Sequence, residues 1–439
     1  MTKRNVLLNI IVLIIFAHLF SIQSGSEPLN IEKLKKIRLK AYLAGGLEWE
    51  GTSTQNTNWH KICETPDGKI WFSGGDHWGT DTISNTDRYE RPWGFGNTAV
   101  SSYDPKKDRA TVEFEMDRVS SLYSNAESPG HGKIHSNIQC DSKGNLYTAG
   151  YLGSSYEHEY TQAYYPKSYL GGAIIKYNPK TKDVDYFGIP CPNSAIVGLY
   201  YDEKRNIVNG ITVDRAKFWR VNLTTMEVNR YESIARMSRV NDRVREMIMD
   251  YDGVCYFAND VGGLTWFDPD TEVFTDLDVE LPGDKMDFRA SVVSSKNVIY
   301  AITTDGLVWS YDTRSGKFTN YGHVIGMPDQ PHYTPNIALD EKWERLYFLA
   351  GNNGGPLLKS ALEVLTILDL KTEKFYWVGQ VEDVEGCFGA LCASDHTVYF
   401  SCFGSYRQGD TVETGKNGRP VTRPFLVRYN PPKNLADLK

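Results

Sequence analysis

One phrase recurs along this chain: an apolar strand, a short polar turn, and a second apolar strand that ends in small residues. A clear copy is GKIHSNIQCDSKGNLYTAG at residues 132–150. A unit this short cannot bury its apolar face alone, so stacked copies must cover one another and the repeat decides the fold. Six further copies begin at His60, Ala195, Arg245, Phe288, Pro335 and Cys387.

Each hairpin is followed by a third strand with its own ending, such as SSYDP at Tyr103, IIKYNP at Tyr177 and LVRYNP at Tyr429. The first six third strands are followed by a turn and a short fourth strand. Four antiparallel strands in each of seven repeats predict an all-β fold, a seven-bladed β-propeller. The alternative is an array of two-sheet sandwiches, which rarely repeat one hairpin signature seven times.

The last repeat stops at Pro431 and Pro432 without a fourth strand. A free sheet edge there would pair with other chains, so we expect another segment to cover it. The apolar segment near residues 37–43 is the one we predict to close the ring.

The first 25 residues have the pattern of a secretory signal peptide. Lys3 and Arg4 precede an apolar run over residues 6–20, and small and polar residues follow around 24–26. That run is too short for a comfortable membrane span. We therefore expect residues 1–25 to be removed and residues 26–439 to form one propeller domain that is secreted, extracellular or periplasmic, with no membrane span.

The net charge of −7 excludes the basic surface of a nucleic-acid-binding protein. The sequence has no Gly-rich phosphate loop, no GxSxG turn and no HExxH pair, so we expect no organic cofactor. We also expect a monomer. An anionic ligand would need a local basic pocket on this acidic protein.

Aligning the hairpins on their turns places polar residues near the starts of the innermost strands, at the rim of the central channel. Two Arg and two His around one mouth would make a local anion site. The adjacent loop at residues 151–172 carries six Tyr. Clustered Tyr beside Arg and His is typical of carbohydrate recognition, although such residues can also simply solvate a channel. The rim residues are His60, His135, Arg245, Arg289 and Asn336.

Three of the motifs together resemble those of the seven-bladed propeller ulvan lyases, which are exported bacterial polysaccharide lyases. The motifs are KIH at His135, AIVGLYYD with Tyr200, and TVDRAKFW with Arg215. The resemblance implies that His135 and Tyr200 carry out the proton transfers of β-elimination and that Arg215 neutralises the uronate carboxylate. It also implies that His158 and Tyr256 contribute to the substrate pocket.

Elimination chemistry is compatible with these residue types. The proton α to a carboxylate is very weakly acidic unless the developing charge is neutralised, and Arg does this without losing its own proton. His suits proton transfer near neutral pH, whereas Tyr needs a cationic neighbour. Tyr200 lies four residues deeper in its strand than His135, so a rise of ~3.3 Å per residue separates them by over ~10 Å unless the strands are staggered.

The sequence therefore predicts a secreted lyase that cleaves an anionic, uronate-containing and sulfated polysaccharide such as ulvan. Arg245 and Arg289 at the channel rim are predicted to bind this substrate. Two alternatives remain: a non-catalytic propeller that binds glycans or proteins, and a propeller lyase for another uronate such as oligogalacturonate.

The seven cysteines are scattered, and most are predicted to be small buried hydrophobes. Cys387 and Cys402 differ because the turn between their strands places them opposite each other. They could form a structural Zn²⁺ site with His332 as the nearest further ligand and His323 as the alternative to it. They could also form a disulfide or remain unbridged buried thiols.

Overall fold

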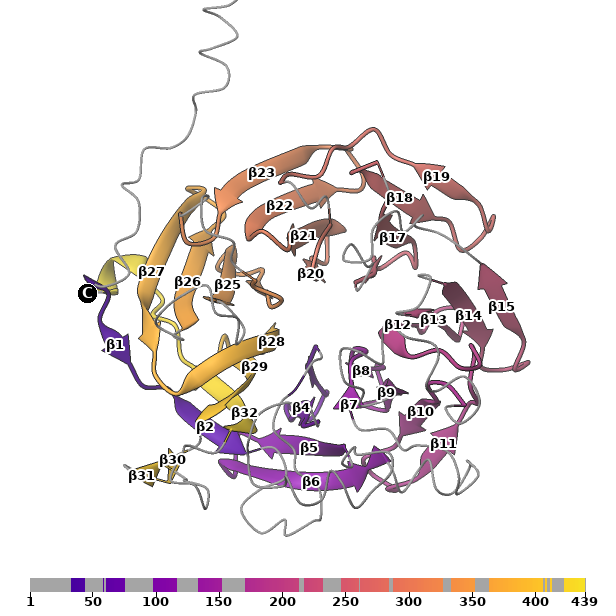
Figure 1. Cartoon of the computed structure of the whole chain (residues 1–439), viewed down its shortest axis with the longest axis horizontal. Coiled ribbons are helices and arrows are strands. Elements are labelled where there is room, and N and C mark those ends of the chain that lie inside the picture. The colour runs from indigo at the N-terminus through magenta and orange to yellow at the C-terminus, as the bar shows by residue number, and fades with distance from the viewer. Residues whose placement is uncertain are drawn as a thin grey trace, which may run out of the picture.

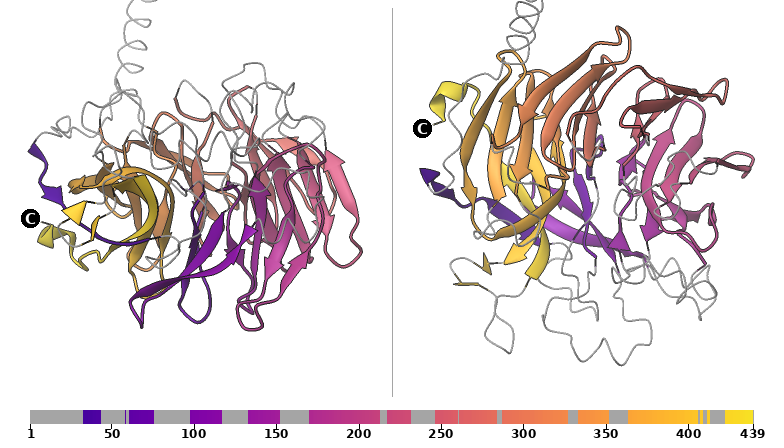
Figure 2. Two further views of the ribbon diagram at one scale, coloured as in Figure 1. Left: turned by 60° about the horizontal axis from the view of Figure 1, so that its bottom comes forward. Right: turned by 45° about the horizontal axis from the view of Figure 1, so that its top comes forward.

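The structure is a computed structural model that describes residues 33–43, 58, 61–75, 98–116, 133–151, 170–212, 217–231, 246–259, 261–283, 287–326, 333–351, 363–405, 407–408, 411–412 and 422–438. Seven antiparallel sheets are arranged as blades around a central channel (Figure 1). The predicted all-β, seven-bladed propeller is confirmed. Figure 2 shows the same ring from two further directions.

The first four blades run in chain order, each from the channel outwards. Blade 1 contains β3 (Cys63–Glu64), β4 (Ile70–Ser73), β5 (Ala99–Asp104) and β6 (Arg109–Glu115). Blade 2 contains β7 (Lys133–Ile134), β8 (Gln139–Cys140), β9 (Leu146–Tyr151), β10 (Ile174–Tyr177) and β11 (Val184–Tyr186). Blade 3 contains β12 (Ile196–Asp202), β13 (Ile207–Thr212), β14 (Phe218–Asn222) and β15 (Val228–Tyr231). Blade 4 contains β16 (Ile248–Met249), β17 (Cys255–Ala258), β18 (Leu264–Phe267) and β19 (Phe274–Asp276).

The last three blades complete the ring. Blade 5 contains β20 (Ala290–Val293), β21 (Val298–Ile302), β22 (Leu307–Asp312) and β23 (Phe318–His323). Blade 6 contains β24 (Ala338–Asp340), β25 (Arg345–Ala350), β26 (Glu363–Asp369), β27 (Lys374–Val381) and, outermost, β1 (Lys36–Ile37). Blade 7 contains β28 (Val384–Cys392), β29 (Val398–Ser405), β32 (Thr422–Tyr429) and β2 (Lys40–Leu43). A small hairpin of β30 (Arg407–Gln408) and β31 (Thr411–Val412) precedes β32, and the 3₁₀ helix η2 (Leu435–Asp437) follows it.

The core lies between the blades, because each blade is covered on both faces. Strand β4 illustrates this: Trp71 and Phe72 are both 0% exposed, although their side chains point in opposite directions. Trp71 packs toward blade 2, with its ring centroid 5.8 Å from that of Tyr177. Phe72 belongs to the cluster that contains Tyr399 of blade 7. Second strands therefore read as continuous apolar runs rather than alternating ones.

The N-terminal strand closes the ring as predicted, with one difference. Strand β2 pairs antiparallel with β32, so that Tyr42 lies opposite Leu426. The residues just before it do not extend that pairing, because β1 pairs parallel with β27 of blade 6. The N-terminal segment thus spans two blades. On the outside, Asp108 of blade 1 accepts hydrogen bonds from Tyr42 and Tyr103, the latter at 2.8 Å.

Three pairs of neighbouring blades share one contact at the turns between first and second strands. In each pair, the backbone N–H and the hydroxyl of a turn serine donate to the two carboxylate oxygens of a glutamate on the adjacent blade, at distances of 2.5–2.9 Å. We refer to these contacts as the Ser–Glu clamps. They join Ser142 to Glu203, Ser295 to Glu341, and Ser394 to Glu64.

No helix in the described part of the chain is long and apolar enough to cross a membrane. The predicted signal peptide, residues 1–25, lies outside the described residues.

Candidate functional site

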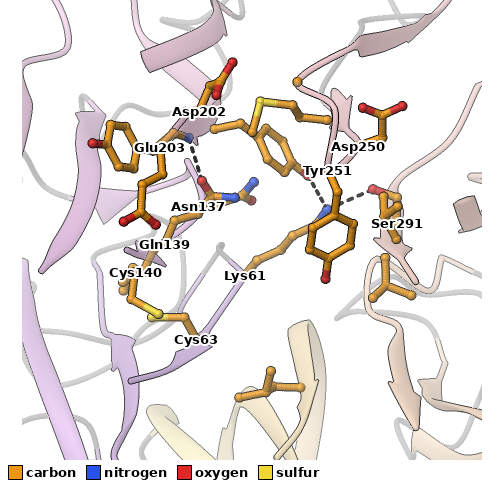
Figure 3. A pocket seen from close by; sticks show the side chains of 18 of the residues that line it. Lys61, Cys63, Asn137, Gln139, Cys140, Asp202, Glu203, Asp250, Tyr251 and Ser291 are labelled. Atoms are coloured by element: carbon orange, nitrogen blue, oxygen red, sulfur yellow. Dashed lines mark hydrogen bonds between the residues drawn. The ribbon is translucent and has the colours of Figure 1, made fainter. Parts of the chain in front are cut away.

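A cavity of about 630 Å³ lies in the channel, lined mainly by the innermost strands of blades 1 to 5 (Figure 3). It runs from Lys61 and Tyr200 in the middle of the channel to the turn residues Glu203 and Tyr251. The described cavity therefore reaches the face of the first hairpin turns. Of the predicted rim residues, His60 and Arg245 lie outside the described residues.

Four side chains from four different blades meet at the inner end of this cavity, and three of them, Lys61, Tyr200 and Ser291, line it. The Lys61 Nζ atom donates to the Tyr200 hydroxyl at 2.8 Å and to the Ser291 Oγ atom at 3.0 Å. Lys61 also forms an ion pair with Glu246. Glu246 Oε1 accepts further hydrogen bonds from Tyr200 at 3.2 Å and from Ser291 at 3.0 Å. We call this set of residues the channel cluster.

The propeller places these residues together because each lies on or just before an innermost strand. Lys61 precedes β3, Tyr200 is within β12, Glu246 precedes β16 and Ser291 is within β20. The inner segments of blades 1 and 2 are also directly joined, since the Ile138 N–H donates to the Lys61 carbonyl oxygen at 3.0 Å. Lys61 is thereby fixed at the channel wall.

The cluster combines a cation, a carboxylate and a phenol that are largely removed from water. Burial raises the pKa of Tyr200 to about 12; Glu246 adds to the rise and Lys61 opposes it. Burial alone would lower the pKa of Lys61, but Glu246 and Tyr200 outweigh burial and hold the pKa above its ordinary value. At neutral pH the cluster therefore holds a protonated Lys61 and a neutral Tyr200.

Of the predicted catalytic residues, the structure places Tyr200 in the cavity. His135 lies in the gap between β7 and β8, is half-buried, and has its ring centroid 5.2 Å from that of Tyr151. Of the two residues predicted to transfer protons, Tyr200 is among the described residues that line the cavity and His135 is not. Arg215 lies outside the described residues.

Of the predicted substrate-binding residues, Tyr256 and Arg289 are described. Tyr256 is 1% exposed in the second strand of blade 4, and its hydroxyl donates to Asp250 Oδ2 at 3.0 Å. Tyr256 thus packs in the core on the side of blade 5, and its predicted part in the substrate pocket stays a prediction. Arg289 directly precedes β20, as expected, with its guanidinium 4.9 Å from the centre of the Tyr333 ring. His158 and Arg245 lie outside the described residues.

Cys387 and Cys402 are opposite each other in the β28–β29 register, as predicted. Both are 0% exposed, and a hydrogen bond joins their thiol groups. The third predicted zinc ligand, His332, lies outside the described residues. His323 is committed elsewhere: its Nε2 atom bonds the Asp305 carbonyl oxygen at 2.8 Å, and its Nδ1 atom accepts from the Ile325 N–H at 3.4 Å. The zinc site stays a prediction.

Sequence reasoning missed Lys61, Glu246 and Ser291. The alignment singled out the residues next to the first two, His60 and Arg245, because their charge or ring nitrogens suggested anion binding. A signal was available in the alternation of a strand: Lys61 and Cys63 lie two positions apart, and both line the cavity. Counting outward from the turn by twos would have selected Lys61.

Comparisons with known proteins identify the fold but no family: no family model matches, and no curated protein sequence matches. The structure of U3-55K aligns with a TM-score of 0.52 at 10% identity, covering 89% of this chain and 98% of that chain. A protein from Lactobacillus plantarum aligns with a TM-score of 0.51 at 11% identity, covering 82% of this chain and 99% of that chain.

The extracellular domain of BT4673 from B. thetaiotaomicron aligns with a TM-score of 0.50 at 11% identity. That alignment covers 90% of this chain but 40% of that chain, so this chain spans less than half the length of that relative. Identities this low establish the propeller fold and carry no activity with them.

Proposed function

We propose that this chain is an exported polysaccharide lyase that cleaves a uronate-containing, sulfated polysaccharide such as ulvan by β-elimination. The observation that carries the proposal is the 2.8 Å hydrogen bond between Lys61 Nζ and the Tyr200 hydroxyl inside the channel cavity. A phenol transfers protons at neutral pH only where a cation stabilises its ionised form. Lys61 supplies that cation, and about 630 Å³ is in the usual range for a ligand pocket.

The protonation states of the cluster favour Tyr200 as the acid. With a pKa of about 12, the phenol is protonated at neutral pH and can give its proton to the leaving glycosidic oxygen. His135 would take the proton α to the carboxylate, and the electron pair left behind would form the double bond as the carbon–oxygen bond breaks. Arg215 would neutralise the carboxylate, and Lys61 would steady the developing tyrosinate.

The test is the rise in absorbance at the ultraviolet band of unsaturated uronates when the protein is mixed with ulvan. Tyr200→Phe should lower the rate by about 10²- to 10⁴-fold, the range for loss of a general acid. Tyr147→Phe is the matched control, since its hydroxyl is buried in β9 outside the cavity lining. Wild-type turnover in Tyr200→Phe would remove Tyr200 from the mechanism.

A second candidate function is a non-catalytic propeller that binds glycans or proteins. It is favoured because the polar groups of the channel cluster already bond one another. Glu246 accepts hydrogen bonds from Lys61, Tyr200 and Ser291. The same assay separates the candidates. Binding of ulvan without an absorbance rise supports the binding module, and a rise with oligogalacturonate alone names a lyase for a different uronate.

A further inference from the structure

The innermost strands of blades 1 and 2 bring two cysteines together at the cavity wall. The Ile138 N–H donates to the Lys61 carbonyl oxygen at 3.0 Å, which fixes the register of the two segments. Two residues onward along each segment are Cys63 and Cys140. Because successive side chains of a strand point to opposite sides, Cys63 lies on the same side of its segment as Lys61, and Cys140 on the same side as Ile138. Figure 3 shows the two sulfur-bearing side chains directed toward each other.

The spacing suits a covalent link. A hydrogen bond joins the Cys63 and Cys140 thiols, so the two sulfur atoms already lie near each other, as disulfide formation requires. Cys63 and Cys140 belong to different blades, and both are free thiols in the structure. A bond between them would therefore join two sheets without requiring the backbone to move far.

The two thiols have different surroundings and so different reactivity. Both line the cavity; Cys63 is 9% exposed and Cys140 is half-buried. A hydrogen bond from Cys63 lowers the pKa of the Cys140 thiol, while the hydrogen bond with Cys140 and burial raise the pKa of Cys63. The Cys140 Sγ atom also lies 3.0 Å from the Glu64 carbonyl oxygen, to which it donates. Cys140 is also the more exposed of the two thiols, so an incoming disulfide reaches it first.

We propose that Cys63 and Cys140 form a thiol–disulfide exchange site that closes an interblade disulfide when a small organic disulfide enters the cavity. The Cys140 thiolate attacks one sulfur of the incoming disulfide, forming a mixed disulfide and releasing one thiol. Cys63 then attacks the Cys140 sulfur, and the second thiol leaves. The protein loses two electrons and two protons, and the small disulfide gains both.

Formation of this disulfide changes both the wall of the cavity and the link between blades 1 and 2. The Cys140 S–H no longer donates to the Glu64 carbonyl, and the walls formed by blades 1 and 2 are held at a fixed separation. The other facing pair, Cys387 and Cys402, provides a built-in comparison, because it lies within one blade and is 0% exposed. Accessibility through the cavity, rather than proximity alone, distinguishes the proposed site.

The test uses the folded mature chain, reduced and then exposed to glutathione disulfide. Alkylation after denaturation should find the free thiols reduced from seven to five. Peptide mapping should recover one linked pair, Cys63 with Cys140, about 2 Da lighter than the two reduced peptides. In Cys63→Ser, a glutathione adduct should instead accumulate on Cys140, because the resolving thiol is missing.

Cys387→Ser is the matched control and should form the Cys63–Cys140 link at the wild-type rate. Three results would overturn the proposal: seven thiols unchanged in the folded wild type, a glutathione adduct on wild-type Cys140 that never resolves, or linkage of Cys387 to Cys402 in its place. Because the wild-type peptide map suffices for each, the result does not depend on how well the Cys63 variant folds.

Discussion

The oppositely charged side chains of Lys61 and Glu246 are mostly buried, at 20% and 8% exposed. Removing such groups from water costs several kcal/mol per ion, and their attraction offsets this only with good geometry and additional hydrogen bonds. Tyr200 and Ser291 provide those hydrogen bonds to the carboxylate. An anionic ligand entering the cavity would compete with Glu246 for the Lys61 ammonium, so binding and the ionisation of Tyr200 are coupled.

His323 gives a pH-dependent prediction at the same scale. Burial lowers its pKa below the ordinary value near 6.5, although the Asp305 carbonyl opposes the shift. The unfolded chain therefore takes up the proton first as pH falls. The stability that neutral His323 contributes is fully present above pH 6.5 and is lost as pH falls through the lower, folded-state pKa.

The measurement is the free energy of unfolding in urea for wild type and His323→Gln, at pH 7.5 and below pH 6.5. The gap in unfolding free energy between the two proteins should narrow at the lower pH, because the unfolded wild-type chain then binds a proton at His323 that the folded chain does not bind. A gap that is the same at both pH values would show that His323 does not titrate in this range.

At the scale of residues, strand periodicity predicts which way a side chain faces, but it does not predict which charged residues will pair. Tyr200 could be predicted to face the channel from its strand position. Lys61 and Glu246 could not be paired, because they are separated along the chain by three blades' worth of sequence and meet only when the ring closes. The burial of Tyr256 could not be read from strand alternation, because second strands bury both faces; its hydroxyl donates to Asp250 of the same blade.

At the scale of elements, the N-terminal segment adds one strand to each of two blades. Strand β2 covers the open edge of β32, and β1 adds a parallel strand to β27. The missing fourth strand of the last repeat made the first pairing predictable. The second was not, because a two-residue parallel pairing has no periodicity to detect.

A chain that begins at residue 44 should therefore be less stable and prone to associate. It lacks β1 and β2, which leaves the backbone N–H and C=O groups of β32 unpaired. We expect a lower unfolding midpoint and dimers or larger species in size-exclusion chromatography, whereas a chain that begins at residue 33 should behave as wild type. A monomeric shorter chain with an unchanged midpoint would mean that β2 is dispensable.

At the scale of the whole molecule, the blades hold one another through contacts repeated around the ring. The Ser–Glu clamp at Glu203 joins blades 2 and 3, and the clamp at Glu341 joins blades 5 and 6. Each clamp supplies two hydrogen bonds to a carboxylate, and because both sites are exposed we expect each loss to cost about 1 kcal/mol. Neither clamp shares a partner with the other.

Glu203→Ala and Glu341→Ala should thus be additive to within about 0.5 kcal/mol when combined, provided that the ring unfolds as one unit. Urea unfolding of the two single variants and the double variant tests this. Ser142→Ala/Glu203→Ala serves as the contrast, since removal of both partners of one clamp should cost little more than removal of one. Two separate unfolding transitions in the double variant would contradict a single cooperative ring.

The N-terminal segment that spans blades 6 and 7 also determines when, during synthesis, the ring can close. Arg38 contacts Glu382, 344 positions later, and bringing such distant residues together costs about 5 kcal/mol of chain entropy. At a synthesis rate of ~5–20 residues per second, the partners of β1 and β2 emerge on the order of tens of seconds after these strands. During that interval the ring cannot close, because the strands that β1 and β2 pair with have not yet been synthesised.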